Sequence, residues 1–402
     1  MANPLVALTM IVKNEAPTIA ATLASAGDAV DLVVILDTGS TDKTKDLIVE
    51  YFDDVSMAAE PYPGGKWRGA HFGGPVFECV LREEQFADFA TTRNRVLAIH
   101  AEQPDAAVFS LMLSGGEILH GGPSLRAFLA DHRDSAFNAF NVEVRYGDSL
   151  RFFYPHVLRV GGPWRYEGTG HEVPVNPDNP DDPAPIIPGC WIEHAVDPPE
   201  ELLPKLRDRN LPLLMADLAA AKTDRAKARV LMHIAQTYDM LANLAPKDEP
   251  GGEFLTLTTA AMGYYLRRVE MGGYPDEVLV ARLGYLNNAA AIGTYTPTEM
   301  LRQLAPLDGN RPEVAYMVAA YVEKARGPSD GYRAAVEAVR VAKASHEQVM
   351  TLTPVDLSCL WRSHLIAARC ARALGWEADA RKHAAAGVAA GKTGEAFEEY
   401  VR

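Results

Sequence analysis

Short apolar runs alternate with amphipathic segments over the first hundred residues. Leu5–Val12 and Asp31–Leu36 have the length and apolar character of buried strands. Each is followed by a helical pattern, over Pro17–Ala26 and over about Thr41–Tyr51, and Ser40 is placed to cap the second helix. This alternation predicts a parallel sheet with right-handed crossovers.

The strand and helix patterns continue, less regularly, to about residue 198. The next segments with such character are a helix at Phe89–His100 and strands at Ala106–Leu113, Ala136–Arg145 and Phe152–Val160. Two stretches rich in Gly, Pro and charge, Ala58–Glu84 and Asn176–Pro188, are predicted to be loops.

After about Asp197 the strand patterns give way to helical patterns rich in Ala and Leu. These cover Glu200–Ala221, Arg225–Ala242, Phe254–Gly272, Pro275–Ile292, Pro312–Arg326, Gly331–Ala344, Leu357–Leu374 and Trp376–Ala390. Their lengths and short turns are typical of stacked helix pairs, although no strict repeat of about 34 residues recurs. The chain is therefore predicted to hold an α/β domain over residues 1–198 and an all-α, tetratricopeptide-like helical-repeat domain over residues 199–402.

Composition narrows the function classes. With 53 acidic and 39 basic residues the formal net charge is -14, which disfavours binding to a phosphate backbone. The four cysteines are scattered and form no C-x-x-C pair, so neither structural zinc nor a disulfide framework is indicated. We see no signal peptide and no apolar stretch of about 20 residues, and we expect a cytoplasmic protein without a membrane partner.

Two polar strings follow the first two predicted strands. They are Thr9-Met10-Ile11-Val12-Lys13-Asn14-Glu15 and Leu36-Asp37-Thr38-Gly39-Ser40-Thr41-Asp42-Lys43-Thr44. Open α/β sheets bind ligands at the carboxyl ends of their strands, where Asp37 stands. Its carboxylate is suited to accept from a uracil N–H or a ribose hydroxyl. The structural alternative is that Asp37 and Asp42 only end a strand and cap a helix.

Together these strings resemble the opening of a family 2 glycosyltransferase with the GT-A fold, a Rossmann-like mixed sheet with helices on both faces. The resemblance implies a set of nucleotide contacts, namely Ile11, Val12, Asn14, Glu15, Asp37, Gly39, Ser40 and Asp42. The string Asp88-Phe89-Ala90-Thr91-Thr92-Arg93-Asn94 is similar to the family's Phe-x-x-Ala-Arg-Asn helix, which implies that Arg93 and Asn94 also contact the nucleotide. The planar fork of Arg93 suits a pyrophosphate, whereas the alternative is an exposed arginine on an amphipathic helix.

The sequence departs from the family where the metal-binding D-x-D is expected. Leu113-Ser114-Gly115-Gly116-Glu117 has lost both aspartates and keeps only the trailing glutamate. A divalent cation that bridges a diphosphate prefers carboxylate oxygens. Three interpretations stay open: Glu117 holds Mn²⁺ or Mg²⁺ with a histidine, the backbone N–H groups of Ser114, Gly115 and Gly116 form a nest for the diphosphate, or catalysis is lost.

Two further strings complete the resemblance. Trp164-Arg165-Tyr166-Glu167-Gly168-Thr169-Gly170-His171-Glu172 resembles the family's Arg-Tyr-x-Gly-x-x-His-Glu segment, which lies near the sugar and the acceptor, and Arg165 is counted with the donor contacts. Inverting transfer needs a base, and Glu172 and Glu117 are the candidates. Trp191-Ile192-Glu193-His194 matches the closing Ile-x-His, so the resemblance implies His171 and His194 as candidate metal ligands beside Glu117.

The resemblance implies transfer of a hexose, with inversion, from a UDP- or GDP-type donor to an unidentified acceptor. Protein, glycan and modified nucleobase acceptors remain open. The helical domain is expected to bind an acceptor protein or to form a homo-oligomer. One alternative is an inactive nucleotide-sugar-binding or scaffold protein. Another is a phage-type glycosyltransferase that acts on modified DNA bases through a basic cleft of Lys66, Arg68, Arg82, Arg145 and Arg165.

Overall fold

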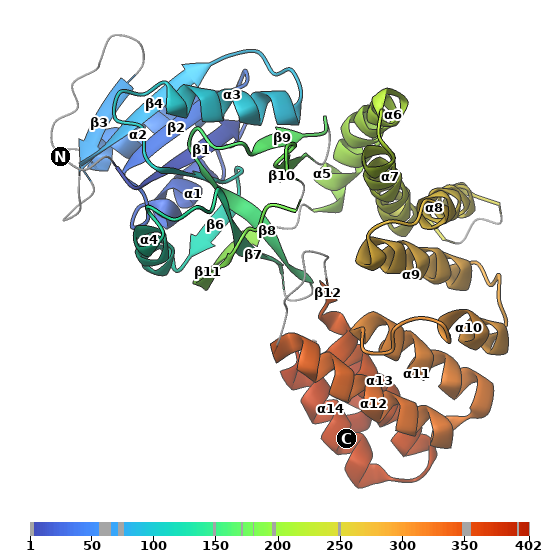
Figure 1. Cartoon of the computed structure of the whole chain (residues 1–402). Helices are drawn as coiled ribbons and strands as arrows, with labels where there is room; N and C mark the ends of the chain where they lie inside the picture. The colour runs from blue at the N-terminus through green and yellow to red at the C-terminus, as the bar shows by residue number, and fades with distance from the viewer. Residues whose placement is uncertain are drawn as a thin grey trace. The chain divides into compact units, whose positions relative to one another are not determined.

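The chain divides into two compact units, which are an α/β domain and a helical domain. The computed structural model describes residues 4–55, 66–70, 76–147, 150–169, 172–179, 181–194, 198–247, 251–347, 355–391 and 394–401. The first unit comprises Met1–Gly147 and Phe153–Val196, and the second comprises Asp148–Phe152 and Asp197–Arg402. Figure 1 shows the strands in the first and the successive helices in the second. The predicted fold class, α/β followed by all-α, is confirmed.

The elements of the first unit alternate as the apolar pattern predicts and include several that it did not. In chain order they are β1 (Val6–Val12), α1 (Ile19–Ala26), β2 (Leu32–Asp37), α2 (Thr44–Val55), β3 (Lys66–Ala70), β4 (Val76–Glu83), α3 (Phe89–Ala101), β5 (Phe109–Met112), β6 (Glu117–His120), α4 (Gly122–Asp131), β7 (Ala139–Tyr146), β8 (Leu150–Arg159), β9 (Arg165–Glu167), β10 (Val173–Val175) and β11 (Ile186–His194).

The main sheet is mixed. Its strand order is β3-β4-β2-β1-β5-β8-β7-β11-β6. Strands β4, β2, β1 and β5 are parallel, while β8 runs antiparallel to β5 and β6 antiparallel to β11. Strands β9 and β10 form a separate antiparallel pair. The carboxyl ends of β1, β2 and β5 therefore meet at one edge of the sheet.

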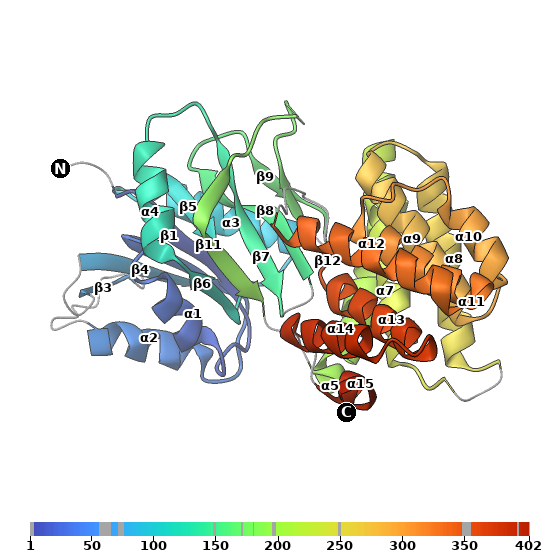
Figure 2. The same cartoon turned by 90° about the horizontal axis from the view of Figure 1, so that it is seen from below.

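Helices cover both faces of this sheet because the side chains of each strand alternate between them. In β1, Leu8 and Met10 join the core formed with α1, α2 and α4. Their neighbours Ala7 and Ile11 join the opposite core, which α3 covers. Figures 1 and 2 show α3 on one side of the strands and α1 and α4 on the other.

The predicted loop Ala58–Glu84 is wrong in its second half. Strand β4 lies there and pairs in parallel with β2, and β3 pairs antiparallel with β4. The apolar residues Cys79 and Val80 are buried in the sheet. The sequence pattern predicted a loop because the apolar run is short and many Gly and Pro residues lie around it. The predicted loop Asn176–Pro188 similarly overlaps the start of β11.

The second unit is a succession of helices. They are α5 (Pro199–Pro204), a π-helical turn (Lys205–Asn210), α6 (Leu211–Ala220), α7 (Asp224–Leu244), α8 (Glu253–Glu270), α9 (Pro275–Ala291), α10 (Pro297–Leu304), α11 (Pro312–Arg326), α12 (Pro328–Glu347), α13 (Ser358–Ala373), α14 (Glu377–Ala389), a 3-10 turn (Gly394–Phe397) and α15 (Glu398–Val401), with the short β12 (Val355–Asp356) before α13. Successive helices such as α7 and α8, or α12 and α13, pack against each other.

Two details of the helical pattern differ from the expectation. The predicted helix Glu200–Ala221 is interrupted by the π-helical turn that begins just after Pro204, where the missing proline N–H breaks the regular hydrogen-bond ladder. Helix α10 was not predicted, although Thr296 and Glu299 form a capping box at its start. Among the described residues, no helix is both long and apolar enough to cross a bilayer.

Candidate functional site

The loops that follow β1 and β2 are joined by side-chain contacts. Asn14 has a φ of 57°, in the left-handed region that asparagine tolerates better than most residues. Its N–H donates to Oγ of Ser40 (2.9 Å), and its side-chain oxygen accepts from the N–H of Thr41 (2.8 Å). The two polar strings of the sequence thus form one structure at the carboxyl edge of the sheet.

Asp42 stabilises the start of α2. Its Oδ1 accepts from the N–H (3.0 Å) and the hydroxyl (2.5 Å) of Thr44, and its Oδ2 accepts from the N–H of Ala16 (3.2 Å). The hydrogen bond from the Thr44 hydroxyl is the main cause that holds the pKa of Asp42 below its usual range. The Thr44 hydroxyl also accepts from the N–H of Glu15 (2.7 Å). These contacts match the structural alternative for Asp42.

Asp37 ends β2 and is fully buried. Its Oδ1 accepts from the N–H groups of Gly39 (2.9 Å) and Ser40 (2.8 Å). Its Oδ2 is buried and has no hydrogen-bond partner within the described part of the chain. A buried carboxylate oxygen without a donor is costly. Asp37 therefore combines the structural role with an acceptor that remains available for a ligand.

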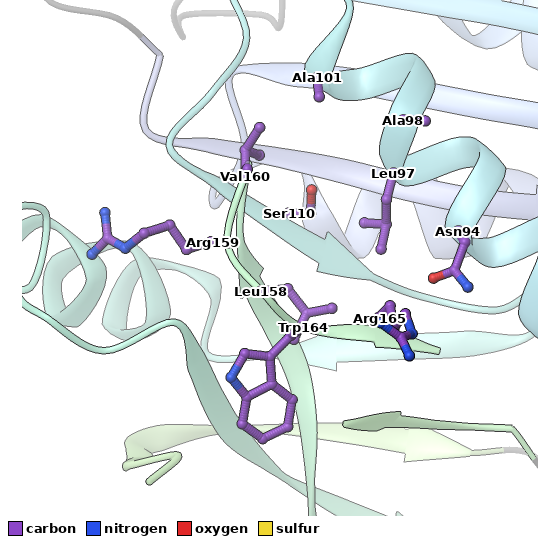
Figure 3. A pocket seen from close by; sticks show the side chains of 12 residues that line it. Asn94, Leu97, Ala98, Ala101, Ser110, Leu158, Arg159, Val160, Trp164 and Arg165 are labelled. Carbon is purple, nitrogen blue, oxygen red and sulfur yellow. The ribbon is translucent and has the colours of Figure 1, made fainter. Parts of the chain in front are cut away.

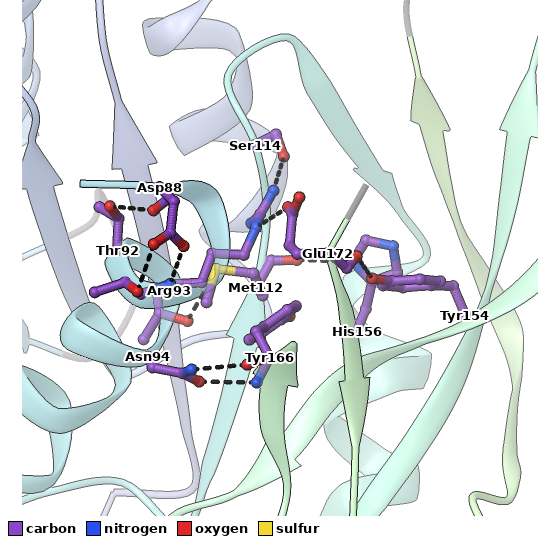
Figure 4. Close-up of polar contacts among 12 residues, drawn as sticks. Asp88, Thr92, Arg93, Asn94, Met112, Ser114, Tyr154, His156, Tyr166 and Glu172 are labelled. Carbon is purple, nitrogen blue, oxygen red and sulfur yellow. Dashed lines mark hydrogen bonds and ion pairs between the residues drawn. The ribbon is translucent and has the colours of Figure 1, made fainter. Parts of the chain in front are cut away.

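Arg93, on the first turns of α3, reaches the turn after β5. Its Nε donates to Oε1 of Glu172 (2.5 Å) and its Nη2 to Oγ of Ser114 (3.0 Å). Figure 4 shows this guanidinium between the two partners. Burial opposes its charge, but the carboxylate of Glu172 more than offsets this, so the pKa of Arg93 is raised. Asp88 caps the helix by accepting from the N–H of Thr91 (2.7 Å).

Tyr166 lies beneath this arginine. The Arg93 guanidinium carbon is 5.5 Å from the centre of the Tyr166 ring. Both ends of the Asn94 amide bind the Tyr166 backbone, at 2.8 and 2.9 Å, and so fix β9 against α3. The phenol of Tyr166 is buried and has no hydrogen-bond partner among the residues described. Burial raises its pKa well above the usual range, so the hydroxyl remains a donor.

Glu117 and His194 face each other across the antiparallel strands β6 and β11. Nδ1 of His194 lies 3.1 Å from Oε1 of Glu117, and the N–H of Ser114 donates to Oε2 (2.7 Å). Burial works against the carboxylate, but the His194 hydrogen bond and the nearby His156 lower the pKa of Glu117 overall. Glu117 is therefore an ionised side chain whose two oxygens both have protein partners.

His156 is a member of this region that the sequence reasoning missed. It lies in β8, and its Nδ1 donates to the carbonyl of Met112 (2.8 Å), so its Nε2 carries the lone pair in the neutral form. Burial lowers its pKa. Two residues earlier, the hydroxyl of Tyr154 donates to the carbonyl of Glu172 (2.8 Å). In the sequence, Tyr154 and His156 stand at alternate positions of a largely apolar strand, and this pattern could have indicated that both face the candidate site.

The turn from Ser114 to Glu117 is packed against the loop after β1. A Cβ added at Gly115 would lie 2.1 Å from Cδ of Glu15. Oε2 of Glu15 accepts from the hydroxyl of Thr18 (2.9 Å). Gly116 has a φ of 80° in the left-handed region. Because the Ser114 N–H already donates to Glu117, one of the three amides of the proposed glycine nest is occupied.

The described residues around this turn do not fit a divalent cation. No group of three or more His, Cys, Asp or Glu side chains that could hold a metal ion occurs among them. Both oxygens of Glu117 are engaged, and Arg93 places a positive charge on Ser114. Of the three candidate ligands, Glu117 and His194 contact each other, while His171 lies outside the described residues.

Arg165 does not point toward Arg93 and the Ser114 turn. Neighbouring residues of a strand project to opposite sides, and Tyr166 takes the side that faces Arg93. Arg165 is exposed and paired with Glu167 (3.0 Å). It lines a cavity of about 350 Å³, with Asn94 and Leu97 of α3 and Trp164, which Figure 3 shows. Arg165 and Asn94 are thus associated with this cavity.

The remaining predicted residues lie along the same carboxyl edge. Val12 is buried at the end of β1, and its carbonyl accepts from the N–H (2.9 Å) and hydroxyl (3.0 Å) of Thr38. Ile11 packs on the core beneath α3. Gly39 has a φ of 96°, and an added Cβ there would meet nothing within 4 Å. The structure therefore gathers at this edge all the described candidates except Arg165 and Asn94.

Comparisons with known proteins add no family. No family model and no curated protein matches the chain. One matching solved structure is described as "Crystal structure of BtubC (BKLC) from P. vanneervenii", with 11% sequence identity and a TM-score of 0.27 over 48% of this chain and 91% of that chain. At this TM-score the likeness supports no argument about either fold or function.

Proposed function

We propose that the chain is a glycosyltransferase that moves a hexose from a nucleotide diphosphate sugar of the UDP or GDP type to an acceptor. The observation on which this proposal rests is Asp37. Its buried Oδ2 lacks a donor at the carboxyl end of β2, where ligands bind in open α/β sheets. A nucleobase N–H or a ribose hydroxyl would supply that donor.

The polar cluster after β5 suits the other half of such a donor. Arg93, Ser114 and Glu172 come from three separate segments and lie in hydrogen-bond contact. Glu172 is the base that we assign to the acceptor proton, because it is a carboxylate that lies next to Arg93 at the Ser114 turn. Glu117 is the weaker candidate, since both its oxygens already have partners.

The competing functions fit less well. In the basic cleft required for DNA, Arg82 pairs with Glu102, Arg145 with Glu143 and Arg165 with Glu167, while the side chains of Lys66 and Arg68 lie outside the described residues. Each of these three arginines brings a carboxylate with it, which lowers the net positive charge that a long DNA backbone would meet there. An inactive nucleotide-sugar-binding protein would share the Asp37 site, so donor hydrolysis or transfer distinguishes it from an enzyme.

The test uses the variant Asp37→Asn. Asparagine keeps the oxygen that accepts from Gly39 and Ser40 and turns the unpartnered oxygen into an NH₂ group, so the fold should remain. Binding of UDP, GDP and TDP sugars is measured by calorimetry and thermal shift, with Mn²⁺ and with EDTA. We expect one donor to bind the wild type and to lose about tenfold or more in affinity on the substitution.

Wild-type binding that Asp37→Asn leaves unchanged would remove the observation on which the proposal rests. Absence of any donor binding to the wild type would refute the proposed function itself. Binding without hydrolysis or transfer, tested over a panel of protein and glycan acceptors, would favour the inactive binding protein.

A further inference from the structure

A positive charge of the protein stands where the family resemblance expects a metal ion. Arg93 contacts Ser114, the first residue of the turn that replaces D-x-D, through Nη2 at 3.0 Å. The guanidinium is fixed on several sides: Glu172 binds Nε, Tyr166 lies against its face and Asp88 caps its helix. Arginine stays charged at any physiological pH.

The same position is unfavourable for a divalent cation. A cation at Ser114 would be repelled by the arginine, and the turn offers no carboxylate between Leu113 and Glu117. The carboxylate of Glu15 reaches Gly115, but its Oε2 accepts from Thr18. The oxygens of Glu117 bind His194 and the Ser114 N–H.

We propose that Arg93, in place of a divalent cation, binds the anionic diphosphate of the ligand at the Ser114 turn, and that Glu172 occupies this arginine in the free protein. The inference rests on the proposed function only for the identity of the ligand as a nucleotide diphosphate. It adds that Arg93 is the group that binds the diphosphate, and that Glu172 neutralises Arg93 when no ligand is bound.

Glu172 is the competitor in this scheme. Its Oε1 binds Nε of Arg93 at 2.5 Å, and the side chains of the pair are only 13% and 12% exposed. With Glu117 ionised nearby, an incoming diphosphate would meet excess negative charge unless Glu172 leaves the arginine. Exchange of one anion for another at the guanidinium keeps its charge compensated. It also releases Glu172, the residue to which we assign the acceptor proton.

Tyr166 supplies a donor for the same ligand. Its hydroxyl is buried beside Arg93 and has no partner among the described residues. A buried tyrosine hydroxyl normally has a hydrogen-bond partner. An oxygen of the bound diphosphate would provide the acceptor that is absent in the free protein.

The experiment measures binding of inorganic pyrophosphate by calorimetry in EDTA, on the full chain. Three proteins are compared: the wild type, Glu172→Gln, and the double variant Arg93→Gln/Glu172→Gln. The double variant removes both charges of the pair together, so it leaves no unpaired buried charge and should fold. Thermal unfolding of each protein checks this, and binding of Mn²⁺ alone to the wild type is measured in parallel.

We expect the wild type to bind pyrophosphate in EDTA, Glu172→Gln to bind it about tenfold more tightly because a competing charge is gone, and the double variant to lose binding. A wild type that binds pyrophosphate only with Mn²⁺, or a Glu172→Gln variant that binds no more tightly, would overturn the proposal. A double variant that retains affinity would also overturn it. If pyrophosphate behaves as expected but no nucleotide sugar binds, the inference stands and the proposed function fails.

Discussion

The two units bury polar side chains in different ways. In the α/β unit, Arg93, Ser114 and Glu172 come from distant parts of the chain and meet at one edge of the sheet. In the helical unit, polar contacts join successive helices, such as Arg268 of α8 with Glu277 of α9 and His364 of α13 with His383 of α14. Contacts between successive helices are what a repeat architecture needs to hold together. Convergence of distant segments, in contrast, indicates a site.

The largest effect that tests this comparison concerns Arg268. This arginine is 1% exposed and binds Glu277 (2.8 Å) and the carbonyl of Gly272 (2.7 Å). Glu277→Ala leaves a buried charge without its counter-ion, and we expect the helical unit to lose roughly 3 kcal/mol of unfolding free energy. The measurement is urea unfolding followed by circular dichroism.

The matched control is Glu337→Ala, because the pair with Arg340 is exposed on both sides. This variant should lose less than about 0.5 kcal/mol of unfolding free energy. Neither variant should change pyrophosphate affinity, and a change with Glu277→Ala would show that the helical pair is not purely structural.

A second test concerns the close packing of successive helices. A Cβ added at Gly284 of α9 would lie 2.4 Å from Cζ of Tyr265, which is buried on α8. Gly284→Ala is expected to cost about 2 kcal/mol by forcing the two helices apart. Gly263→Ala is the control, since an added Cβ there meets nothing within 4 Å. It should stabilise α8 by about 0.8 kcal/mol through helix propensity. Equal effects of the two substitutions would contradict this packing.

A third test uses pH. Burial lowers the pKa of His364 to about 4 and also lowers the pKa of His383, whose Nδ1 lies 2.9 Å away. Lys343 and Lys382 act in the same direction, Asp379 opposes them, and the Tyr332 hydroxyl lies 3.4 Å from His383. Because the folded pKa is below the unfolded value, the stability contribution is complete above about pH 6.5 and is lost as the pH falls toward 4.

The free energy of unfolding is expected to change by at most about 1.4 kcal/mol per pH unit for each proton taken up on unfolding. In the helical unit, His364→Asn should make the unfolding free energy depend less on pH. His100, whose pKa burial also lowers to about 4, would keep the same dependence in the α/β unit. Urea midpoints between pH 7 and pH 4 measure both, and an unchanged slope in His364→Asn would count against the buried pair.

The smallest effects come from two helix caps. Asp88 caps α3 and Thr223 caps α7, each by accepting one backbone N–H. Replacement of either by Ala should cost about 1 kcal/mol. Only Asp88→Ala should also weaken pyrophosphate binding, because α3 positions Arg93. If Thr223→Ala weakened binding equally, the contrast between the units would be lost.

The sequence predicted many of the helices and strands, but few of the contacts among the candidate site residues. Apolar patterns predicted β1, β2 and α3, and the family resemblance made Asp37 and Arg93 candidates. The apolar patterns did not predict β4, whose apolar run is short and lies among glycines and prolines. His156 and the Glu172 contact of Arg93 were also missed. The first depends on the pairing of β8 with β5, and the second on the packing of the β9–β10 pair against α3. The register of β9, which turns Tyr166 and not Arg165 toward Arg93, could not be predicted from the sequence either.

The contact between Glu15 and Gly115 has a consequence for how this protein can vary. The carboxylate of Glu15 fills the space that any side chain at position 115 would need. A residue larger than glycine at 115 therefore requires the Glu15 side chain to move or a shorter residue at 15, and a shorter residue at 15 opens room at the turn. The two positions, a hundred residues apart, are expected to change together among descendants of this sequence.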